Sequence, residues 1–149
     1  MIKEVFKMCD EMMKSCDIDF NDLQSQSIQH DFFENYNNIR IVNSFLFNFS
    51  KLQDKIGAKL FRKVLYELKE IDKENMPMID ILNLLEKLEI LEKAEDWDRL
   101  RELRNSLAHE YPFDISERIE NIKMALEGYN ILKKIYQNLN YAYNHKVVK

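Results

Sequence analysis

Hydrophobic residues recur every three or four positions along most of the chain, which is the period of an amphipathic α-helix. No stretch alternates hydrophobic and polar residues as a half-buried strand does. The pattern predicts helices over residues 2–15, 22–51, 52–71, 77–91, 97–112 and 115–144. Because short loops between helices favour antiparallel neighbours, we expect an all-α fold, an up-and-down bundle of four to five helices. We expect a single domain over residues 1–149.

Polar segments separate the predicted helices. Residues 17–21 form a predicted break, and Asn21 or Asp22 is the expected N-cap of the helix that follows. Residues 72–77 form a predicted loop, with Pro77 suited to a first helical turn. Whether residues 50–57 kink one long helix or separate two helices is not decided by periodicity.

The last two predicted helices have their own boundary signals. Residues 92–96 form a polar connector before the helix at 97–112. Asp114, followed three residues later by Glu117, resembles a capping box, so the final helix is expected to begin at residue 115.

Composition supports long helices and limits the function classes. The chain of 149 residues has two Gly and two Pro, so it has few helix breaks. Its net charge of −4 gives no overall attraction to nucleic acid, so RNA binding would need a local basic patch. No apolar run of about eighteen residues exists and the N-terminus is polar, so we expect no membrane span and no signal peptide.

The residues suited to cofactor chemistry are sparse. Cys9 and Cys16 are seven residues apart on a predicted helix, too far for a disulfide within it, and a reducing cytoplasm is the expected location. The three histidines are far apart, and no HExxH or CxxC spacing occurs. With no glycine-rich phosphate loop either, we expect neither a metal nor a nucleotide cofactor.

A polar cluster ends the helix predicted at 97–112. Its hydrophobic stripe consists of Trp97, Leu100, Leu103 and Leu107. On another face Arg101, Asn105 and His109 follow one another at four-residue spacing, with Arg104 beside them. Tyr111 lies seven residues after Arg104. An ordinary solvated face would favour Glu and Lys, so this group of side chains is the candidate site.

The string RNSLAHEY, from Arg104 to Tyr111, resembles the RX4HXY motif of HEPN-domain proteins, in particular the HepT-like toxins of HEPN–MNT toxin–antitoxin modules. The segments 49–65, 78–91 and 96–112 resemble successive blocks of that subfamily. One position departs from it: relatives often carry a glycine in the turn after the middle block, where this chain has Glu89.

The resemblance implies a dimerising all-α bundle that acts as a metal-independent endoribonuclease. It implies that Arg104 and His109 are the catalytic pair, and that a partner nucleotidyltransferase, the antitoxin, neutralises the toxin by attaching AMP to Tyr111. Asn105 matches the polar residue that commonly follows the motif's arginine. It is a supporting residue suited to orient the imidazole or donate to the phosphate.

The chemistry of these side chains fits the implied reaction. RNA carries its own nucleophile, the 2′-hydroxyl, and an imidazole of pKa about 6.5 exchanges protons near neutral pH. The guanidinium of Arg104 offers a planar set of donors to a phosphate. Since each chain supplies one motif histidine, a homodimer with both motifs in one cleft would provide a base and an acid. It would also join two copies of Arg99, Arg101 and Arg104 into a basic patch.

Structural interpretations stay open for each residue. His109 suits the carbonyls of a helix C-terminus, Arg104 an ion pair with Glu102, Glu110 or another helix, and Tyr111 the edge of the core. Gln53 and Asp54 fall in a segment that resembles the family, and they either line the cleft or cap a helix after Ser50. The alternative function is a non-catalytic HEPN module that binds nucleotides or docks onto a nucleotidyltransferase.

Overall fold

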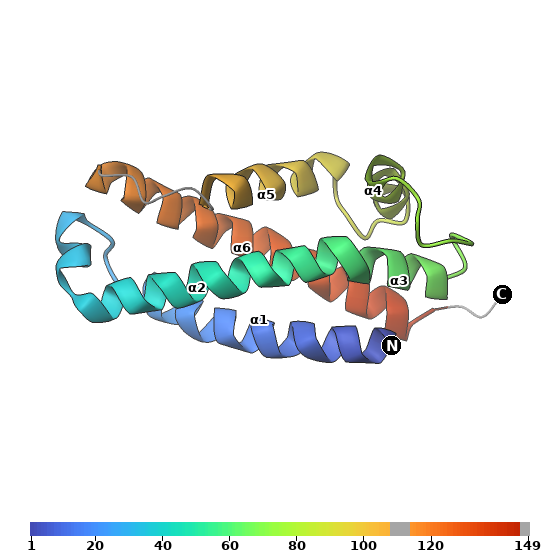
Figure 1. The fold of residues 1–149 in the computed structure, drawn as a ribbon, viewed down its shortest axis with the longest axis horizontal. Helices are drawn as coiled ribbons and strands as arrows, with labels where there is room; N and C mark the ends of the chain where they lie inside the picture. Colours follow the sequence, from blue (N-terminus) through green and yellow to red (C-terminus); the bar gives the residue numbers. More distant parts are fainter. Residues whose placement is uncertain (108–113, 147–149) are drawn as a thin grey trace.

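A computed structural model of the protein describes residues 1–107 and 114–146, and it confirms the all-α bundle (Figure 1). All regular elements of these residues are helical. They are α1 (Ile2–Gln24), the 3-10 turn η1 (His30–Glu34), α2 (Tyr36–Lys55), the π-helical turn η2 (Ile56–Leu60), α3 (Phe61–Glu67), α4 (Met78–Lys87), α5 (Ala94–Leu107) and α6 (Ile115–Asn144). Helices α2, α3 and α6 run in one direction, and α1 and α5 run in the opposite one (Figure 1).

The break predicted at residues 17–21 is wrong, because α1 continues to Gln24. The polar residues there do not face only water. Asp17 accepts hydrogen bonds from two side chains of α6, and Leu23 is completely buried. Tertiary contacts thus outweigh the polar composition of this segment.

The second helix begins at Tyr36 and not at residue 22. Its N-cap is Asn35, whose side chain accepts a hydrogen bond from the backbone N–H of Asn37 at 2.9 Å, so the expectation of Asn21 or Asp22 is wrong. Phe32 lies in the 3-10 turn η1, and its side chain is buried. It continues the hydrophobic period across a segment that is not α-helical.

The structure answers the question left open at residues 50–57. Helix α2 runs directly into η2 and then into α3, so one long helix contains a π-turn. A π-turn contains one residue more than a regular α-helical turn, and such turns are often found at functional sites. It shifts the inward-facing positions after residue 60 relative to those before it.

Helices α3 and α4 end earlier than predicted because the chain adopts a left-handed conformation after each. Lys69 has φ 61° and Glu89 has φ 62°. The backbone N–H of Ile90 then bonds to the carbonyl of Leu85 at 2.9 Å, as in a Schellman C-cap. Glu89 therefore occupies a conformation that glycine usually provides.

The predicted starts of α4, α5 and α6 lie within three residues of the observed ones. Pro77 is the residue just before α4 and not in its first turn. Helix α5 begins at Ala94, inside the predicted connector, where the carboxylate of Glu86 accepts a hydrogen bond from the Ala94 N–H at 2.7 Å. Helix α6 has the predicted bounds, and the Asp114 side chain accepts from the Ser116 N–H at 2.9 Å, which confirms the cap.

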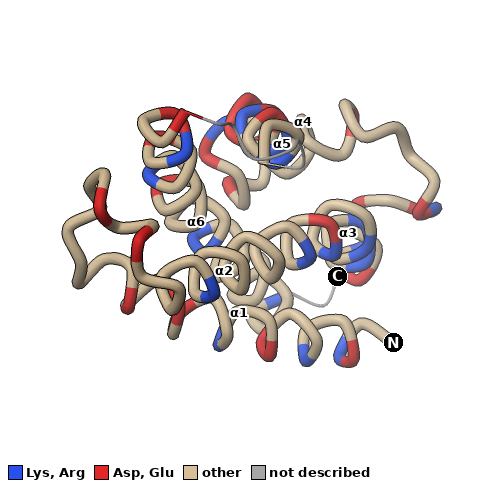
Figure 2. The backbone as a smooth tube through the Cα atoms, turned by 60° about the vertical axis from the view of Figure 1, so that its left-hand side comes forward, with Lys and Arg blue, Asp and Glu red and all other residues tan. Residues whose placement is uncertain are grey.

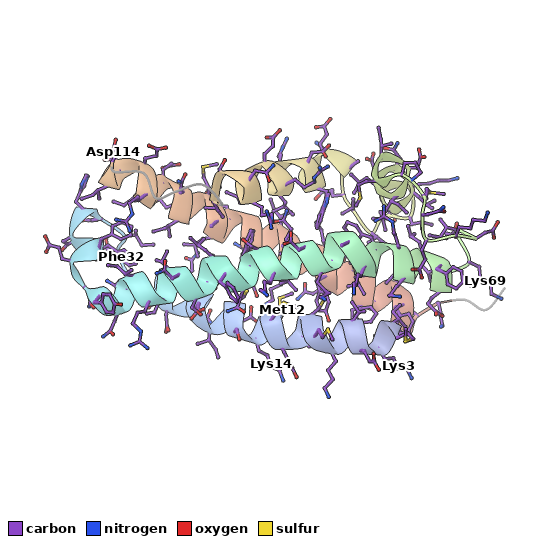
Figure 3. All side chains as sticks on the ribbon, viewed as in Figure 1. Lys3, Met12, Lys14, Phe32, Lys69 and Asp114 are labelled. Atoms are coloured by element: carbon purple, nitrogen blue, oxygen red, sulfur yellow. The ribbon has the colours of Figure 1, made fainter. Side chains whose placement is uncertain are left out.

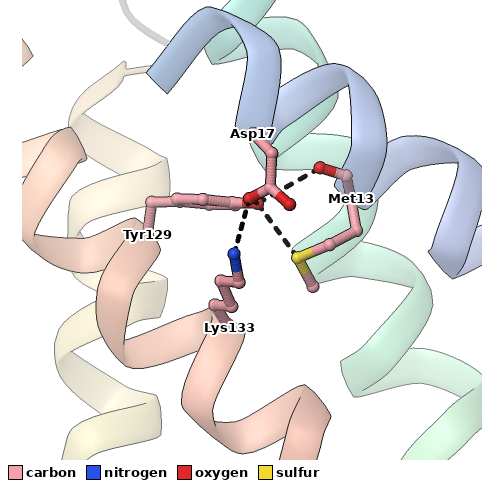
Figure 4. Close-up of polar contacts among 4 residues, drawn as sticks. All are labelled: Met13, Asp17, Tyr129 and Lys133. Carbon is pink, nitrogen blue, oxygen red and sulfur yellow. Dashed lines mark hydrogen bonds and ion pairs between the residues drawn. The ribbon is translucent and has the colours of Figure 1, made fainter. Parts of the chain in front are cut away.

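Helices α1 and α6 are joined by two similar polar contacts. The hydroxyl of Tyr129 lies 2.6 Å from Asp17 Oδ1, and Lys133 Nζ lies 2.9 Å from the same oxygen (Figure 4). Seven residues further along each helix, in opposite directions, the hydroxyl of Tyr136 lies 2.5 Å from Asp10 Oδ1. Burial and these carboxylates raise the pKa of both tyrosines.

Two free thiols lie beside these contacts. Cys9 and Cys16 are both buried, and burial raises the pKa of each thiol to about 12. Nearby carboxylates act in the same direction, whereas the charge of Lys55 opposes the shift at Cys9. Such thiols are protonated near neutral pH and serve as small core residues.

Both glycines of the chain lie where α5 approaches its neighbours. A Cβ atom at Gly57 would come within 2.6 Å of Trp97 Cζ2, and one at Gly128 within 2.6 Å of Leu103 Cδ2. The buried Trp97 ring also meets Phe61 edge-on, with ring centroids 4.6 Å apart. These contacts seat the hydrophobic stripe of α5 against η2 and α6 and confirm the predicted stripe.

We predict that Gly57→Ala destabilises the protein, although alanine favours a helix over glycine by about 1 kcal/mol. The new methyl group would meet the rigid, buried Trp97 ring, and such overpacking typically costs about 1–3 kcal/mol. Urea unfolding should show the lower stability. Gly128→Ala is the matched comparison and should cost less, because the Leu103 side chain can rotate away; equal or greater stability of Gly57→Ala would contradict the close contact.

We also predict that stability falls as the pH rises above about 9. A tyrosine whose pKa is higher in the folded state than its ordinary value of about 10 keeps its proton only when folded, so deprotonation favours unfolding. Tyr129→Phe should be less stable near neutral pH by about 1–3 kcal/mol and should lose less stability above about pH 9. Urea unfolding across pH 7–11 measures both effects, with the exposed Tyr141→Phe as a control that should match the wild type.

Candidate functional site

The best-defined polar contact near the end of α5 joins Arg104 to Asp54 of α2. Arg104 Nε lies 2.8 Å from Asp54 Oδ1, and Arg104 Nη2 donates to Asp54 Oδ2 at 2.8 Å. Both carboxylate oxygens of Asp54 thus face the guanidinium, with a hydrogen bond through Nη2 and a close ion contact at Nε, which has no hydrogen-bond partner within the described residues. The hydrogen bond to Asp54 raises the pKa of Arg104, with the charge of Asp54 adding to it. Arg104 is therefore held as a permanent cation with a set orientation.

The pair lies at the surface. The Arg104 side chain is 34% exposed and that of Asp54 is 54% exposed. Asp54 contacts Nε and Nη2, and within the described parts of the chain Nη1 has no contact. The guanidinium can thus offer further N–H donors to an anion while Asp54 continues to hold it.

The two predicted supporting residues are not joined to this pair by any described contact. Arg101 is exposed, with Nη1 3.8 Å from Asp98 Oδ1 on the same helix. Asn105 is also exposed. Both remain available at the surface of α5, and their supporting roles stay predictions.

Gln53 and Asp54 differ in their surroundings although they are adjacent. Gln53 is 2% exposed, and its Oε1 has no hydrogen-bond partner among residues 1–107 and 114–146. Asp54 is exposed and paired with Arg104. The interpretation of these residues as a cap after Ser50 is wrong, because the helix continues through them. Asp54 lies along a groove between α1 and α2, and its place in the proposed RNA cleft stays a prediction.

Sequence reasoning missed the partner of Arg104. It allowed an ion pair with another helix but did not name Asp54. The two residues are fifty positions apart, and helical periodicity carries no information about contacts at that separation. The one signal was that Asp54 falls in a segment that resembles the HEPN family.

The second half of the motif, including His109 and Tyr111, lies outside the described residues. The other histidines are placed. His30 is exposed in η1, and His145 stacks on Tyr141 with ring centroids 4.0 Å apart. In the two described ranges, no cluster of three His, Cys, Asp or Glu side chains is suited to a metal ion, and no helix is long and apolar enough to cross a membrane.

We predict that the fold does not depend on the Arg104–Asp54 pair. Exposed ion pairs typically contribute less than about 1 kcal/mol, and both side chains here are solvated. A double-mutant cycle with Arg104→Ala, Asp54→Asn and the double variant, measured by urea unfolding, should give a coupling energy of about 1 kcal/mol or less. A loss of several kcal/mol in either single variant would show a structural role instead.

The chain was compared with protein-family models, with curated protein sequences and with solved structures, and none of the three comparisons found a match. Membership of the HEPN superfamily therefore stays a prediction. It depends on the string from Arg104 to Tyr111 and on the neighbouring segments that resemble the HepT-like toxins.

Proposed function

We propose that this protein is a metal-independent endoribonuclease of the HepT-like type, the toxin of a HEPN–MNT toxin–antitoxin module. The observation that carries the proposal is the orientation of Arg104 at the end of α5. Its guanidinium is held by Asp54 and partly exposed, and its Nη1 forms no hydrogen bond or ion pair with any described residue. Arg104 lies five residues before His109 in the sequence.

In the proposed reaction the RNA 2′-hydroxyl attacks the adjacent phosphate. His109 takes the proton of that hydroxyl or returns one to the leaving 5′-oxygen, as an imidazole side chain can near neutral pH. Arg104 binds the phosphate oxygens, on which negative charge increases in the transition state. Asp54 acts on the reaction through Arg104, because it sets the direction of the guanidinium.

The proposal includes a two-fold dimer in the cytoplasm. Proton removal and proton return are most simply performed by two histidines, and one chain supplies a single motif histidine. A dimer with both motifs in one cleft provides the second histidine and doubles the local positive charge of Arg99, Arg101 and Arg104.

Regulation by a partner nucleotidyltransferase belongs to the same proposal. AMP attached to Tyr111 would place a phosphodiester and an adenosine next to the catalytic residues in the sequence. The attached phosphate would compete with the phosphate of RNA for Arg104. The antitoxin would thus inhibit cleavage by filling the anion site.

The test is an RNA cleavage assay with EDTA present. Wild-type protein should cleave, His109→Ala should be slower by about 10²- to 10⁴-fold, and Arg104→Ala by about 10²- to 10³-fold. Arg40→Ala is the matched control. It removes an exposed arginine of α2 that forms no hydrogen bond or ion pair with residues 1–107 and 114–146, so it should leave the rate unchanged.

The outcomes distinguish the proposals from their alternatives. Cleavage that is equal in wild type and His109→Ala would exclude His109 from the catalytic pair, and cleavage that EDTA abolishes would exclude a metal-independent mechanism. A purified, folded protein that cleaves no RNA but binds the nucleotidyltransferase would favour the non-catalytic module. A stable monomer that still cleaves would exclude the shared cleft.

A further inference from the structure

A groove of about 650 Å³ runs between α1 and the α2–η2 helix and passes Asp54. Its α2–η2 side carries three lysines at four-residue spacing: Lys51, Lys55 and Lys59. From the α1 side Met12 reaches between the two helices (Figure 3). The groove therefore has an apolar wall and a row of cations, with about one cation per helical turn.

The three groove lysines have no carboxylate partner in the part of the chain that the structure describes. Two carboxylates line the groove, Glu11 and Asp54, and Asp54 is occupied by Arg104. Lys and Arg alternate with Asp and Glu over much of the molecule (Figure 2), so a row of three cations facing one carboxylate is a local basic surface in a chain of net charge −4.

An exposed aromatic ring adjoins the row. Phe47 is 60% exposed and lies one helical turn before Lys51, whose Nζ is 5.0 Å from the ring centroid. A positive groove beside an exposed aromatic side chain is typical of surfaces that bind single-stranded nucleic acid, where the cations follow the backbone and a base stacks on the ring.

We propose that this groove binds the sugar–phosphate backbone of single-stranded RNA and leads it to Arg104. The inference rests on the proposed function and names the route of its substrate. Asp54 supplies the connection, since it lines the groove and also holds the Arg104 guanidinium. Because Arg104 contacts Asp54, which lines the groove beside Lys51 and Lys55, RNA that follows the lysine row would pass close to Arg104. Phosphates repeat at regular intervals along RNA, as the lysines do along the helix.

The experiment measures RNA binding by the triple variant Lys51→Gln, Lys55→Gln, Lys59→Gln. Fluorescence anisotropy with a labelled single-stranded RNA is read in a His109→Ala background, in which cleavage is slow. If three phosphate contacts are lost, the slope of log affinity against log salt should fall by about 2, and the Kd at low salt should rise by about 10-fold or more. With His109 restored, KM should rise while kcat is retained, because the lysines bind ground state and transition state alike.

Two further variants keep the result interpretable. A control variant removes the same charge by Lys3→Gln, Lys14→Gln and Lys93→Gln. Lys3 and Lys14 point away from α2 (Figure 3). The RNA affinity and the salt slope of this variant should therefore stay close to those of the wild type. Replacement of the three groove lysines by arginine keeps the charge and should retain binding. Failure of the arginine variant to bind, with its helical content intact, would contradict an electrostatic role.

The other outcomes overturn the inference in different ways. If the groove variant and the control variant lose affinity equally, RNA does not follow this groove, while cleavage by the wild type would leave the proposed function intact. If polyglutamate competes with RNA as strongly as unlabelled RNA does, the groove binds acidic peptides. If the wild type neither binds nor cleaves RNA, the proposed function fails together with the groove.

Discussion

The close approach of α5 to its neighbours is the contact on which the candidate site depends. Gly57 and Gly128 leave room for Trp97 and Leu103, and these two side chains fix α5 against the long helix and α6. Arg104 follows Leu103 directly on the same helix. Its position relative to Asp54 is therefore set by hydrophobic packing, and the exposed ion pair orients the side chain without holding the helices together.

The remaining helices form a frame that supports this contact. Tyr129 and Tyr136 of α6 bond to carboxylates of α1, which fixes α1 against α6 at two points seven residues apart. A hydrogen bond to a charged group typically contributes more than one between neutral groups, so these contacts also specify the register of the two helices. Asp10 and Asp17 of α1 thus bond to α6, while other residues of α1 line the groove.

Much of the fold could be predicted from the sequence, and the errors have physical causes. The period of hydrophobic residues over residues 115–144 and the cap at Asp114 predicted α6 fully, because both signals are local. The segment at 17–21 was misinterpreted because Asp17 finds its partners on α6, more than a hundred residues away. The start of α2 was misinterpreted because Phe32 keeps a helical spacing while it lies in a 3-10 turn. Local sequence patterns do not show which distant helices come into contact. For this reason neither the partners of Asp17 nor the ion pair of Arg104 could be predicted.

The π-turn at Ile56–Leu60 has a consequence for how this chain can vary. One extra residue in a helical turn changes the direction of every later side chain by about 100° relative to a regular helix. Before the turn, the helix directs Asp54 toward α5. After the turn, Phe61 and Val64 are buried. Deletion of a single residue here would restore regular α-helical geometry. Either Asp54 or the pair Phe61 and Val64 would then point in the wrong direction. The number of residues in this turn is therefore as constrained as their identity.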